Sequence, residues 1–435
     1  MKIYKFGGTS VGTVERIQNL TKIVNNGEQN LVILSAMAGT TNMLEEIAYY
    51  TDICNKSKAL FISKELRKQY NKTVEQLYSS HKYRLLGESI IESHFTTINN
   101  IINHAIAPDS LKTILAQGEL ISTSLFHIYL KELNIKSVLL NSTDFIKLNK
   151  DEEPDYLDIQ IRLAEQLSEI ENTNIIITQG YICTDHRGYI SNLKRGGSDY
   201  TAAIIGAVIK AEEIQIWTDI DGLHNNDPRY VENTKPIREI SFDEAAELAY
   251  FGAKILHPSS IKPAQVNNIP VRLKNTLNKE DKGTLISEKT KSDNIIAVAS
   301  KDNITSLRIQ STDMLLAYGF LKKIFEIFER YKTPIDLIAT SEVSVSLTID
   351  DTSKLDKIVK ELEKYGTVNI EDKQSIICIV GNCSNEKNGI LATVFRQLES
   401  LPIKTVSYGG NTNNISILLD TMHKIEALNL LNSIL

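Results

Sequence analysis

Apolar, strand-like runs alternate with helix-like segments over roughly the first 290 residues of this 435-residue chain. The strand-like runs are Leu31–Leu34, Ser137–Leu140, Asn174–Thr178, Ile214–Thr218 and Pro270–Leu273. Between them, segments such as Ser198–Lys210 and Ser241–Phe251 carry helical periodicity. This alternation predicts an α/β domain with a mainly parallel sheet covered by helices. Ligands of such sheets collect at the carboxyl ends of the strands.

A mostly helical stretch, residues 55–115, interrupts the alternation. It is rich in Lys, Glu and Tyr, and Ser63–Tyr78 reads as one helix. We interpret it as a lid or a flank of the domain, without chemistry of its own.

Shorter units follow after about residue 290 and form a complete βαββαβ module. Its predicted elements are Ile304–Ser311, Phe320–Tyr331, Ile335–Ser341, Val343–Asp350, Leu355–Tyr365 and Thr367–Glu371. A second copy lacks its sixth strand and comprises Ile376–Gly381, Gly389–Glu399, Lys404–Tyr408, Ile415–Leu419 and His423–Leu435. The strand Ile295–Ser300 can fill that gap, so we expect the first module to be inserted within the second.

The composition excludes several classes of protein. A formal net charge of -6 disfavours a general nucleic-acid binder, and no run of about 18 apolar residues could span a membrane. No signal peptide is recognisable, and the four cysteines form no CxxC pair. We therefore expect a cytoplasmic protein with reduced thiols, no membrane span and no nucleic-acid partner.

Two short glycine turns follow apolar strands, and a basic residue precedes the glycines in each: KFGGTS at 5–10 and RGGSD at 195–199. Glycine allows close approach of the backbone to a phosphate, and a helix N-terminus offers unpaired N–H groups. The first turn is not a Walker A loop, because its lysine precedes the glycines. Either turn alone is compatible with a capped helix without a ligand. Together they indicate a site for a highly charged phosphate donor.

Three further segments carry polar side chains. Glu119, which we expect at the start of a helix, could simply favour the helix dipole. The loop 217–229 begins with D-x-D-G but lacks the spacing and the closing glutamate of a calcium loop, so it suits a nucleotide better. Lys254 adds another cation, whereas His257 is more typical of a structural hydrogen-bonding histidine.

The ordered set of motifs resembles the aspartokinases of the amino-acid kinase superfamily. The motifs are KFGGTS, LSAMAGTTN, QGELIS, RGGSDYTAA, WTDIDGL with NDPR, and FGAKILHP. The two C-terminal modules resemble the paired ACT regulatory domains of those enzymes, and no second dinucleotide-binding domain follows, unlike in the homoserine dehydrogenase fusions. The resemblance implies an amino-acid-kinase sheet between helices at 1–290, a first ACT domain at 303–374, and a second formed by 294–301 plus 375–435.

The resemblance also implies the reaction of ATP with L-aspartate to give 4-phospho-L-aspartate, the first step of lysine, threonine and methionine biosynthesis. The nucleophile is the β-carboxylate, ionised near pH 7 because its pKa is about 3.9, so no general base is needed. The implied catalytic residues are Lys5, Asp199 and Lys254. The implied aspartate-binding residues are Ser35, Thr41, Glu119, Arg195 and Asp199. The implied ATP-binding residues are Lys5, Gly7, Gly8, Thr218, Asp219, His224, Arg229 and Lys254, with His224 where close relatives often carry tyrosine.

Mg²⁺ is expected with ATP, without a protein side chain assigned as its ligand. Lysine is the implied allosteric inhibitor, bound in the first ACT module. The implied effector residues are Met314, Phe320, Leu321, Ile335, Asp336 and Ser341, and Ala317 replaces a serine common in relatives. Asp336 alone could be an ordinary acidic residue between strands. A homodimer through the ACT modules is expected, with a tetramer left open, because unpaired strand edges template association.

Two other functional hypotheses remain open at this point. The same fold could phosphorylate another small acid or a nucleotide, although such relatives lack tandem ACT modules. A catalytically silent amino-acid sensor is the second alternative. The joint presence of Lys5, Glu119, Arg195, Asp199 and Lys254 argues against that sensor.

Overall fold

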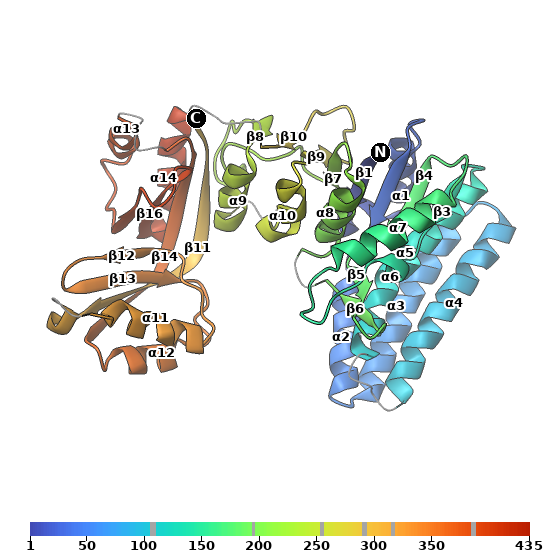
Figure 1. Ribbon diagram of the computed structural model, residues 1–435, viewed down its shortest axis with the longest axis horizontal. Coiled ribbons are helices and arrows are strands. Elements are labelled where there is room, and N and C mark those ends of the chain that lie inside the picture. The colour runs from blue at the N-terminus through green and yellow to red at the C-terminus, as the bar shows by residue number, and fades with distance from the viewer. Residues whose placement is uncertain (105–109, 194–195, 253–255, 289–293, 315–317, 384–388) are drawn as a thin grey trace. The chain divides into compact units, whose positions relative to one another are not determined.

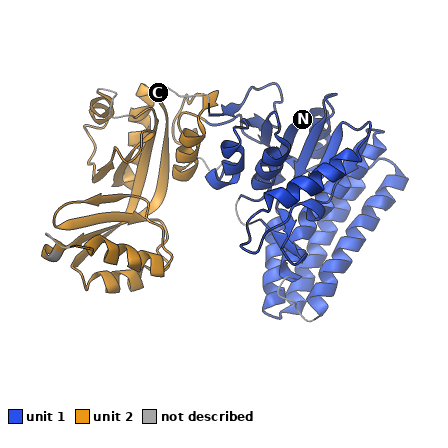
Figure 2. Cartoon of the chain, in the orientation of Figure 1, with its two compact units in different colours: residues 1–223, 256–289 blue, residues 224–255, 290–435 orange. Residues whose placement is uncertain are grey.

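The computed structural model describes residues 1–104, 110–193, 196–252, 256–288, 294–314, 318–383 and 389–435. By compactness the chain divides into two units, one of residues 1–223 and 256–289 and the other of residues 224–255 and 290–435 (Figure 2).

The first unit is built on a mainly parallel sheet (Figure 1). Its strands are β1 (Lys2–Phe6), β2 (Asn30–Leu34), β3 (Ser137–Leu139), β4 (Ile175–Gln179), β7 (Ile214–Thr218), β9 (Val271–Asn275) and β10 (Thr284–Ile286). These strands of the first unit lie in the order β3-β4-β2-β1-β7-β9-β10, and among their described pairings only that of β10 with β9 is antiparallel. The carboxyl ends of β1, β2, β4 and β7 therefore meet at one edge, as the alternation of elements predicts.

Helices cover both faces of this sheet. They are α1 (Val14–Val24), α2 (Thr40–Asp52), α3 (Lys56–Leu77), α4 (His81–Asn103), α5 (Ser110–Glu132), α6 (Ser142–Phe145), α7 (Tyr156–Ser168), α8 (Gly197–Ile209) and α10 (Pro258–Val266), and a hairpin of β5 (Ile182–Thr184) and β6 (Ile190–Asn192) follows β4. Tyr4 and Phe6 of β1 join a core with α1 to α5. Strand side chains alternate between faces, so Ile3 and Lys5 point the other way, where Gly206 of α8 packs beside Ile3.

The helical stretch 55–115 is a flank of the first unit. Helices α3 and α4 pack against each other, α3 against α2, and α4 against α5. Their apolar side chains belong to the same core as those of β1 and β2. Tyr78, after α3, is buried and donates its hydroxyl to the carbonyl of Leu125 at 2.8 Å. The stretch is therefore held by core packing.

The second unit contains a six-stranded antiparallel sheet in the order β12-β13-β11-β14-β16-β15. Its elements are β8 (Glu239–Ile240), α9 (Phe242–Phe251), β11 (Ile295–Gln310), α11 (Phe320–Arg330), β12 (Ile338–Thr340), β13 (Ser344–Ile349), α12 (Leu355–Leu362), β14 (Thr367–Gly381), α13 (Ile390–Gln397), β15 (Thr405–Ser407), β16 (Asn414–Asp420) and α14 (Lys424–Leu431). The predicted strand at 335–341 is shorter than expected, because β12 pairs with β13 only over Ile338–Thr340.

Two long strands connect the two βαββαβ modules. The first half of β11 pairs with the second half of β14, from Ile295 opposite Gly381 to Lys301 opposite Ile376. The second half of β11 pairs with the first half of β14, ending with Gln310 opposite Thr367. The strand at 295–300 thus completes the second module, the pairing that insertion of one module into the other predicts.

Residues 224–252 fall in the same compact unit as the C-terminal modules, although the sequence-based boundary at residue 290 assigns them to the first domain. Val231 lies in the core of the second module, and α9 contacts β11 and β14. Local motif order along the chain gave no signal for this packing, because it depends on contacts with strands that follow later.

Candidate functional site

A lysine and an aspartate meet at the carboxyl end of β1. Lys5 Nζ lies 2.6 Å from Asp199 Oδ1, and the two side chains are only 11% and 14% exposed. Lys5 reaches this position because it lies on the α8 face of β1, and Asp199 lies in the first turn of α8. The contact with Asp199 holds the Lys5 ammonium beside the glycines of the opening turn. Lys5 Nζ lies 3.7 Å from where a Cβ of Gly7 would be.

Close backbone approaches set the start of α8. A Cβ on Gly180, just after β4, would lie 2.3 Å from the Cβ of Ser198, so only glycine fits there. Gly196, with φ of +65°, is in the left-handed region and precedes the helix. Ser35 Oγ, after β2, donates to Ser198 Oγ at 2.9 Å. Arg195, predicted to hold the aspartate carboxylate, lies outside the described residues.

Glu119 is buried in the middle of α5, where it is 4% exposed. The helix begins at Ser110, so the expectation that Glu119 lies at a helix start is wrong, and the helix dipole does not account for it. Its Oε1 accepts a hydrogen bond from the backbone N–H of Ala36 at 3.1 Å. Burial raises the pKa of this carboxyl from 4.5 to about 7, which the bond from Ala36 opposes only in part.

A buried hydrogen-bond relay supports this turn of α5, and sequence reasoning missed it. Thr123 Oγ1 donates to the Glu119 carbonyl at 2.8 Å and accepts from Gln179 Nε2 at 2.9 Å. Gln179 Oε1 in turn accepts from the Ser142 N–H at 2.8 Å. Gln179 and Thr123 are both fully buried. A polar residue that ends an apolar strand is the sequence signal that could have identified Gln179, because a buried polar side chain needs a hydrogen-bond partner.

A second serine ties α5 to the loop after β2. Ser122 Oγ donates to the Ser35 carbonyl at 2.8 Å. The loop after β2 is therefore held to α5 by two hydrogen bonds, one at Ser35 and one from Ala36 to Glu119. Thr41 differs from its predicted neighbours, since it is exposed in the first turn of α2. The buried threonine of that turn is Thr40, whose hydroxyl lies 2.9 Å from that of Tyr70.

The predicted phosphate-binding glycines pack tightly on neighbouring loops. A Cβ on Gly8 would lie 2.8 Å from the Ala36 carbonyl oxygen, and the Gly7 N–H donates to the carbonyl of Trp217 at 3.4 Å. Thr218 ends β7, its carbonyl accepts the Thr276 hydroxyl at 2.8 Å, and Asp219 beside it is exposed. The turn after β1 is thereby brought against the loop after β2 and the end of β7, and the residue after β9 contacts the end of β7.

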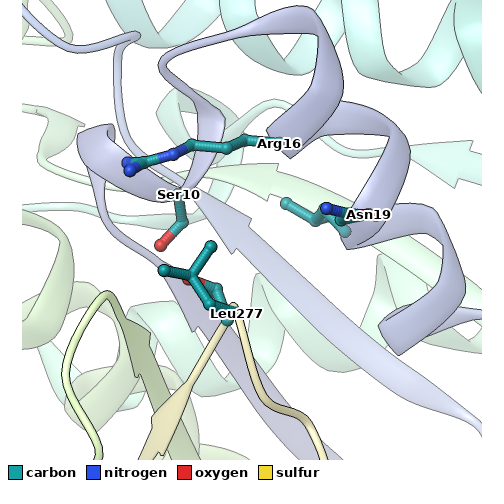
Figure 3. A pocket seen from close by; sticks show the side chains of 6 residues that line it. Ser10, Arg16, Asn19 and Leu277 are labelled. Carbon is teal, nitrogen blue, oxygen red and sulfur yellow. The ribbon is translucent and has the colours of Figure 1, made fainter.

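A small pocket lies beside these loops (Figure 3). It is lined by Ser10, Arg16, Asn19, Leu20, Thr276 and Leu277. Arg16 donates to the carbonyl of Thr9 at 2.5 Å. The cavity volume, about 10 Å³, is room for roughly one water molecule, so this pocket does not hold a nucleotide base.

Other predicted nucleotide residues lie in the second unit. His224 Nδ1 is 2.8 Å from Thr234 Oγ1. Arg229 pairs with Asp227 at 2.6 Å and is 71% exposed, and its hydrogen bond to Asp227 raises the pKa of the guanidinium. Lys254 lies outside the described residues.

The predicted effector residues lie around the first module. Phe320 belongs to the module's core, Met314 and Ile335 pack against that core, and Leu321 is 36% exposed. The remaining two are Asp336 and Ser341. The Asp336 side chain is fully buried, whereas Ser341 is exposed with its hydroxyl 2.8 Å from that of Ser344. Ala317 lies outside the described residues.

Within the described ranges, no group of three His, Cys, Asp or Glu side chains is placed to hold a metal ion. In the same part of the chain, no helix has the length and apolar character needed to cross a membrane.

Comparisons with known proteins give a consistent picture. A model of the amino acid kinase family matches residues 1–275. Lysine-sensitive aspartokinase 3 of Escherichia coli (strain K12) is 34% identical over 430 residues, which cover 96% of this chain and 95% of that protein. The crystal structure of E. coli aspartokinase III in complex with aspartate and ADP (R-state) matches with a TM-score of 0.82 at 32% identity, over 100% of this chain and 99% of that one. The same E. coli enzyme in complex with lysine and aspartate (T-state) matches with a TM-score of 0.83 at the same identity and the same coverage of both chains.

Proposed function

This chain belongs to the amino acid kinase family and is an aspartokinase, and from that premise we propose that it transfers the γ-phosphate of ATP to the β-carboxylate of L-aspartate. The product is 4-phospho-L-aspartate, and the step opens lysine, threonine and methionine biosynthesis in the cytoplasm. The observation that carries the proposal is the arrangement of residues at one edge of the sheet. The Lys5–Asp199 pair lies there with Ser35, Ser198 and the loop after β2 that bonds to Glu119 through Ala36.

The chemistry requires positioning and charge neutralisation. A β-carboxylate oxygen attacks the γ-phosphorus while the bond to ADP breaks, and no proton moves because the carboxylate is already ionised. The Lys5 ammonium stabilises the charge of the transferring phosphoryl group, and Asp199 holds that ammonium in place. The Gly7 and Gly8 backbone allows close approach of the phosphates, and Lys254 supplies a second cation.

Binding of the α-ammonium and α-carboxylate groups of aspartate requires two protein side chains of opposite charge. Glu119, when ionised, pairs with the α-ammonium of aspartate, and Arg195 grips the α-carboxylate. Ser35 and Thr41, which is exposed in the first turn of α2, contact the substrate in this proposal. Thr218, Asp219, His224 and Arg229 serve the nucleotide. These assignments are carried over by motif.

Mg²⁺ accompanies ATP in this proposal. Asp199 is the carboxylate beside Lys5, and one or two carboxylates plus substrate phosphates are the usual ligands of this ion. The ion supplies further neutralisation of the triphosphate charge. Lys5 and Asp199 keep their positions through their own contact.

The two C-terminal modules of the second unit are the regulatory part in this proposal. Residues 303–374 form one ACT module, and 294–301 with 375–435 form the other, as the strand pairing of β11 and β14 favours. L-lysine binds the first module and inhibits, with Asp336 pairing with an ammonium of the effector and Ser341 meeting its polar end. Two chains associate through these modules.

A hydroxamate assay with ATP, Mg²⁺, aspartate and hydroxylamine tests the proposal. Aspartate-dependent hydroxamate, with acetylglutamate and other small acids inactive, is the expected result. A different preferred acid would instead favour the related kinase, and silence with every acid would favour the amino-acid sensor.

A further inference from the structure

Asp336 of the first module is already engaged by two residues of its own chain. Its Oδ1 accepts a hydrogen bond from the Tyr250 hydroxyl at 2.5 Å and lies 2.6 Å from Lys301 Nζ. Lys301 also reaches Asp350 Oδ2 at 2.9 Å and lies 4.5 Å from the centre of the Tyr250 ring. The three residues Tyr250, Lys301 and Asp336 form one contact group, which we name the Asp336 cluster.

The Asp336 cluster leaves one strong acceptor unused. The Asp336 side chain is 0% exposed, yet among the residues that the structure describes its Oδ2 has no hydrogen-bond partner. A buried carboxylate oxygen without a partner is costly, and a second donor is what it favours. The cover that Tyr250 and Lys301 provide means that a ligand ammonium reaches this carboxylate only if the cover shifts.

Lys301 and Tyr250 are both in the protonation state that favours their present contacts with Asp336. Burial opposes the charge on Lys301, but hydrogen bonds to Asp336 and Asp350 raise the pKa of its ammonium overall. Burial, reinforced by the bond to Asp336, raises the pKa of Tyr250 to about 12. Near pH 7 Lys301 is therefore a cation and Tyr250 a donor.

The Asp336 cluster is joined directly to the end of α9. Tyr250 lies in the last turn of that helix, and a Cβ on Gly252 would lie 2.7 Å from the carbonyl oxygen of Ser300, the residue before Lys301. The chain then continues into the FGAK segment, whose Lys254 is assigned to ATP by motif. Tyr250 thus immediately precedes Phe251, the first residue of a predicted nucleotide-binding segment.

We propose that Lys301 competes with the ammonium group of the amino-acid effector for the Asp336 carboxylate. Effector binding then replaces the contacts that Lys301 and Tyr250 make with Asp336. This inference rests on the proposed binding of lysine at Asp336. In the ligand-free chain, Lys301 supplies the same chemical group that the effector brings, on the same carboxylate. When the effector binds, Lys301 retains Asp350, and Tyr250 is released at the end of α9.

The signs of the mutational effects follow from competition. Removal of the Lys301 charge leaves Asp336 without its internal cation, so the effector ammonium binds more tightly. Removal of the Tyr250 hydroxyl weakens only the ligand-free arrangement, so it also shifts the chain toward the effector-bound state. If Lys301 and Tyr250 instead built the pocket, both changes would weaken binding.

The test is titration of the full-length protein with L-lysine by calorimetry, together with lysine inhibition of the kinase reaction. The variants are Lys301→Met, Lys301→Arg and Tyr250→Phe. Lys404→Met is a matched control, because Lys404 also pairs with two carboxylates, Glu371 and Asp420, in the same sheet. Lys301→Met should bind lysine at least about fivefold more tightly, Tyr250→Phe in the same direction, and Lys301→Arg and Lys404→Met as wild type.

Weaker lysine binding by both Lys301→Met and Tyr250→Phe would overturn the inference while leaving lysine as the effector. If Lys301→Met does not fold, Tyr250→Phe decides, since it removes one hydroxyl only, and unchanged or weaker binding by it counts against the inference. A wild-type protein that phosphorylates aspartate but ignores lysine would refute the effector assignment and this inference together. Failure to phosphorylate aspartate at all is a separate result, against the proposed function.

Discussion

With Glu119 in its proposed role at the α-ammonium of aspartate, its raised pKa should make aspartate use depend on pH around neutrality. Below pH 7 the free enzyme carries Glu119 mainly as the neutral acid, which offers no charge to the substrate ammonium. As pH rises through about 7, the carboxylate forms and aspartate binding improves. We therefore expect kcat/KM for aspartate at pH 6 to be about a tenth of its value at pH 8, since kcat/KM reports groups of the free enzyme.

The kcat at saturating aspartate should vary less over the same range. The bound ammonium favours the ionised carboxylate, so the pKa of Glu119 is lower in the complex. Steady-state kinetics at fixed saturating ATP from pH 6 to pH 8.5 measure both quantities. Glu119→Gln should give a low kcat/KM that no longer rises with an apparent pKa near 7.

The same group gives a stability effect of known sign. Its folded pKa lies above its ordinary value, so the stabilisation is complete below about pH 4.5 and is lost as pH rises through about 7. The rise from 4.5 to about 7 corresponds to roughly 3 kcal/mol of unfolding free energy. Urea unfolding at pH 5 and pH 8 should show wild type losing about that much relative to Glu119→Gln. A flat kcat/KM profile together with no such difference would refute the reasoning.

Three other substitutions test the site. Lys5→Ala should lower kcat by at least roughly 100-fold without unfolding the chain, because charge stabilisation of the transferring group is lost; kcat within about tenfold of wild type would assign Lys5 a structural role. Thr123→Val leaves Gln179 Nε2 buried without its acceptor, so it should cost about 1–3 kcal/mol of unfolding free energy and raise KM for aspartate but not for ATP. Thr97→Val, which removes a similar threonine bond to a helix carbonyl on α4, is its control and should change neither KM. Arg195→Ala should raise KM for aspartate far more than KM for ATP, and the reverse order would place that loop at the nucleotide.

Much of the architecture was accessible from local patterns. The apolar run followed by a glycine turn predicts where β1 ends, the apolar run Ile214–Thr218 predicts β7, and the incomplete second module predicts that residues 295–300 pair with 376–381. Local patterns succeed here because strand ends and turn residues are set by nearby sequence. Lys5 and Asp199, which the sequence analysis assigns to one site, lie 2.6 Å apart, and their catalytic roles stay a prediction.

Long-range contacts were not accessible in the same way. The helical stretch before Glu119 extends to Ser110, so a motif that looked like a helix start lies within the helix. The relay from Gln179 to Thr123 joins a strand and a helix far apart in sequence, and the Tyr250–Asp336 bond joins α9 to the first module. Periodicity reports which face of an element is apolar, but it does not report which polar partner the other element supplies.

Isotope transfer tests the central claim, direct attack of the aspartate β-carboxylate on phosphorus, most directly. Aspartate labelled with ¹⁸O in the β-carboxylate is incubated with the enzyme, ATP and Mg²⁺, and hydroxylamine then attacks the acyl carbon and releases phosphate. Mass spectrometry of that phosphate should show one ¹⁸O atom from the carboxylate, and aspartate labelled only in the α-carboxylate should give none. Unlabelled phosphate from the β-labelled substrate, or label transferred from the α-carboxylate, would contradict the account.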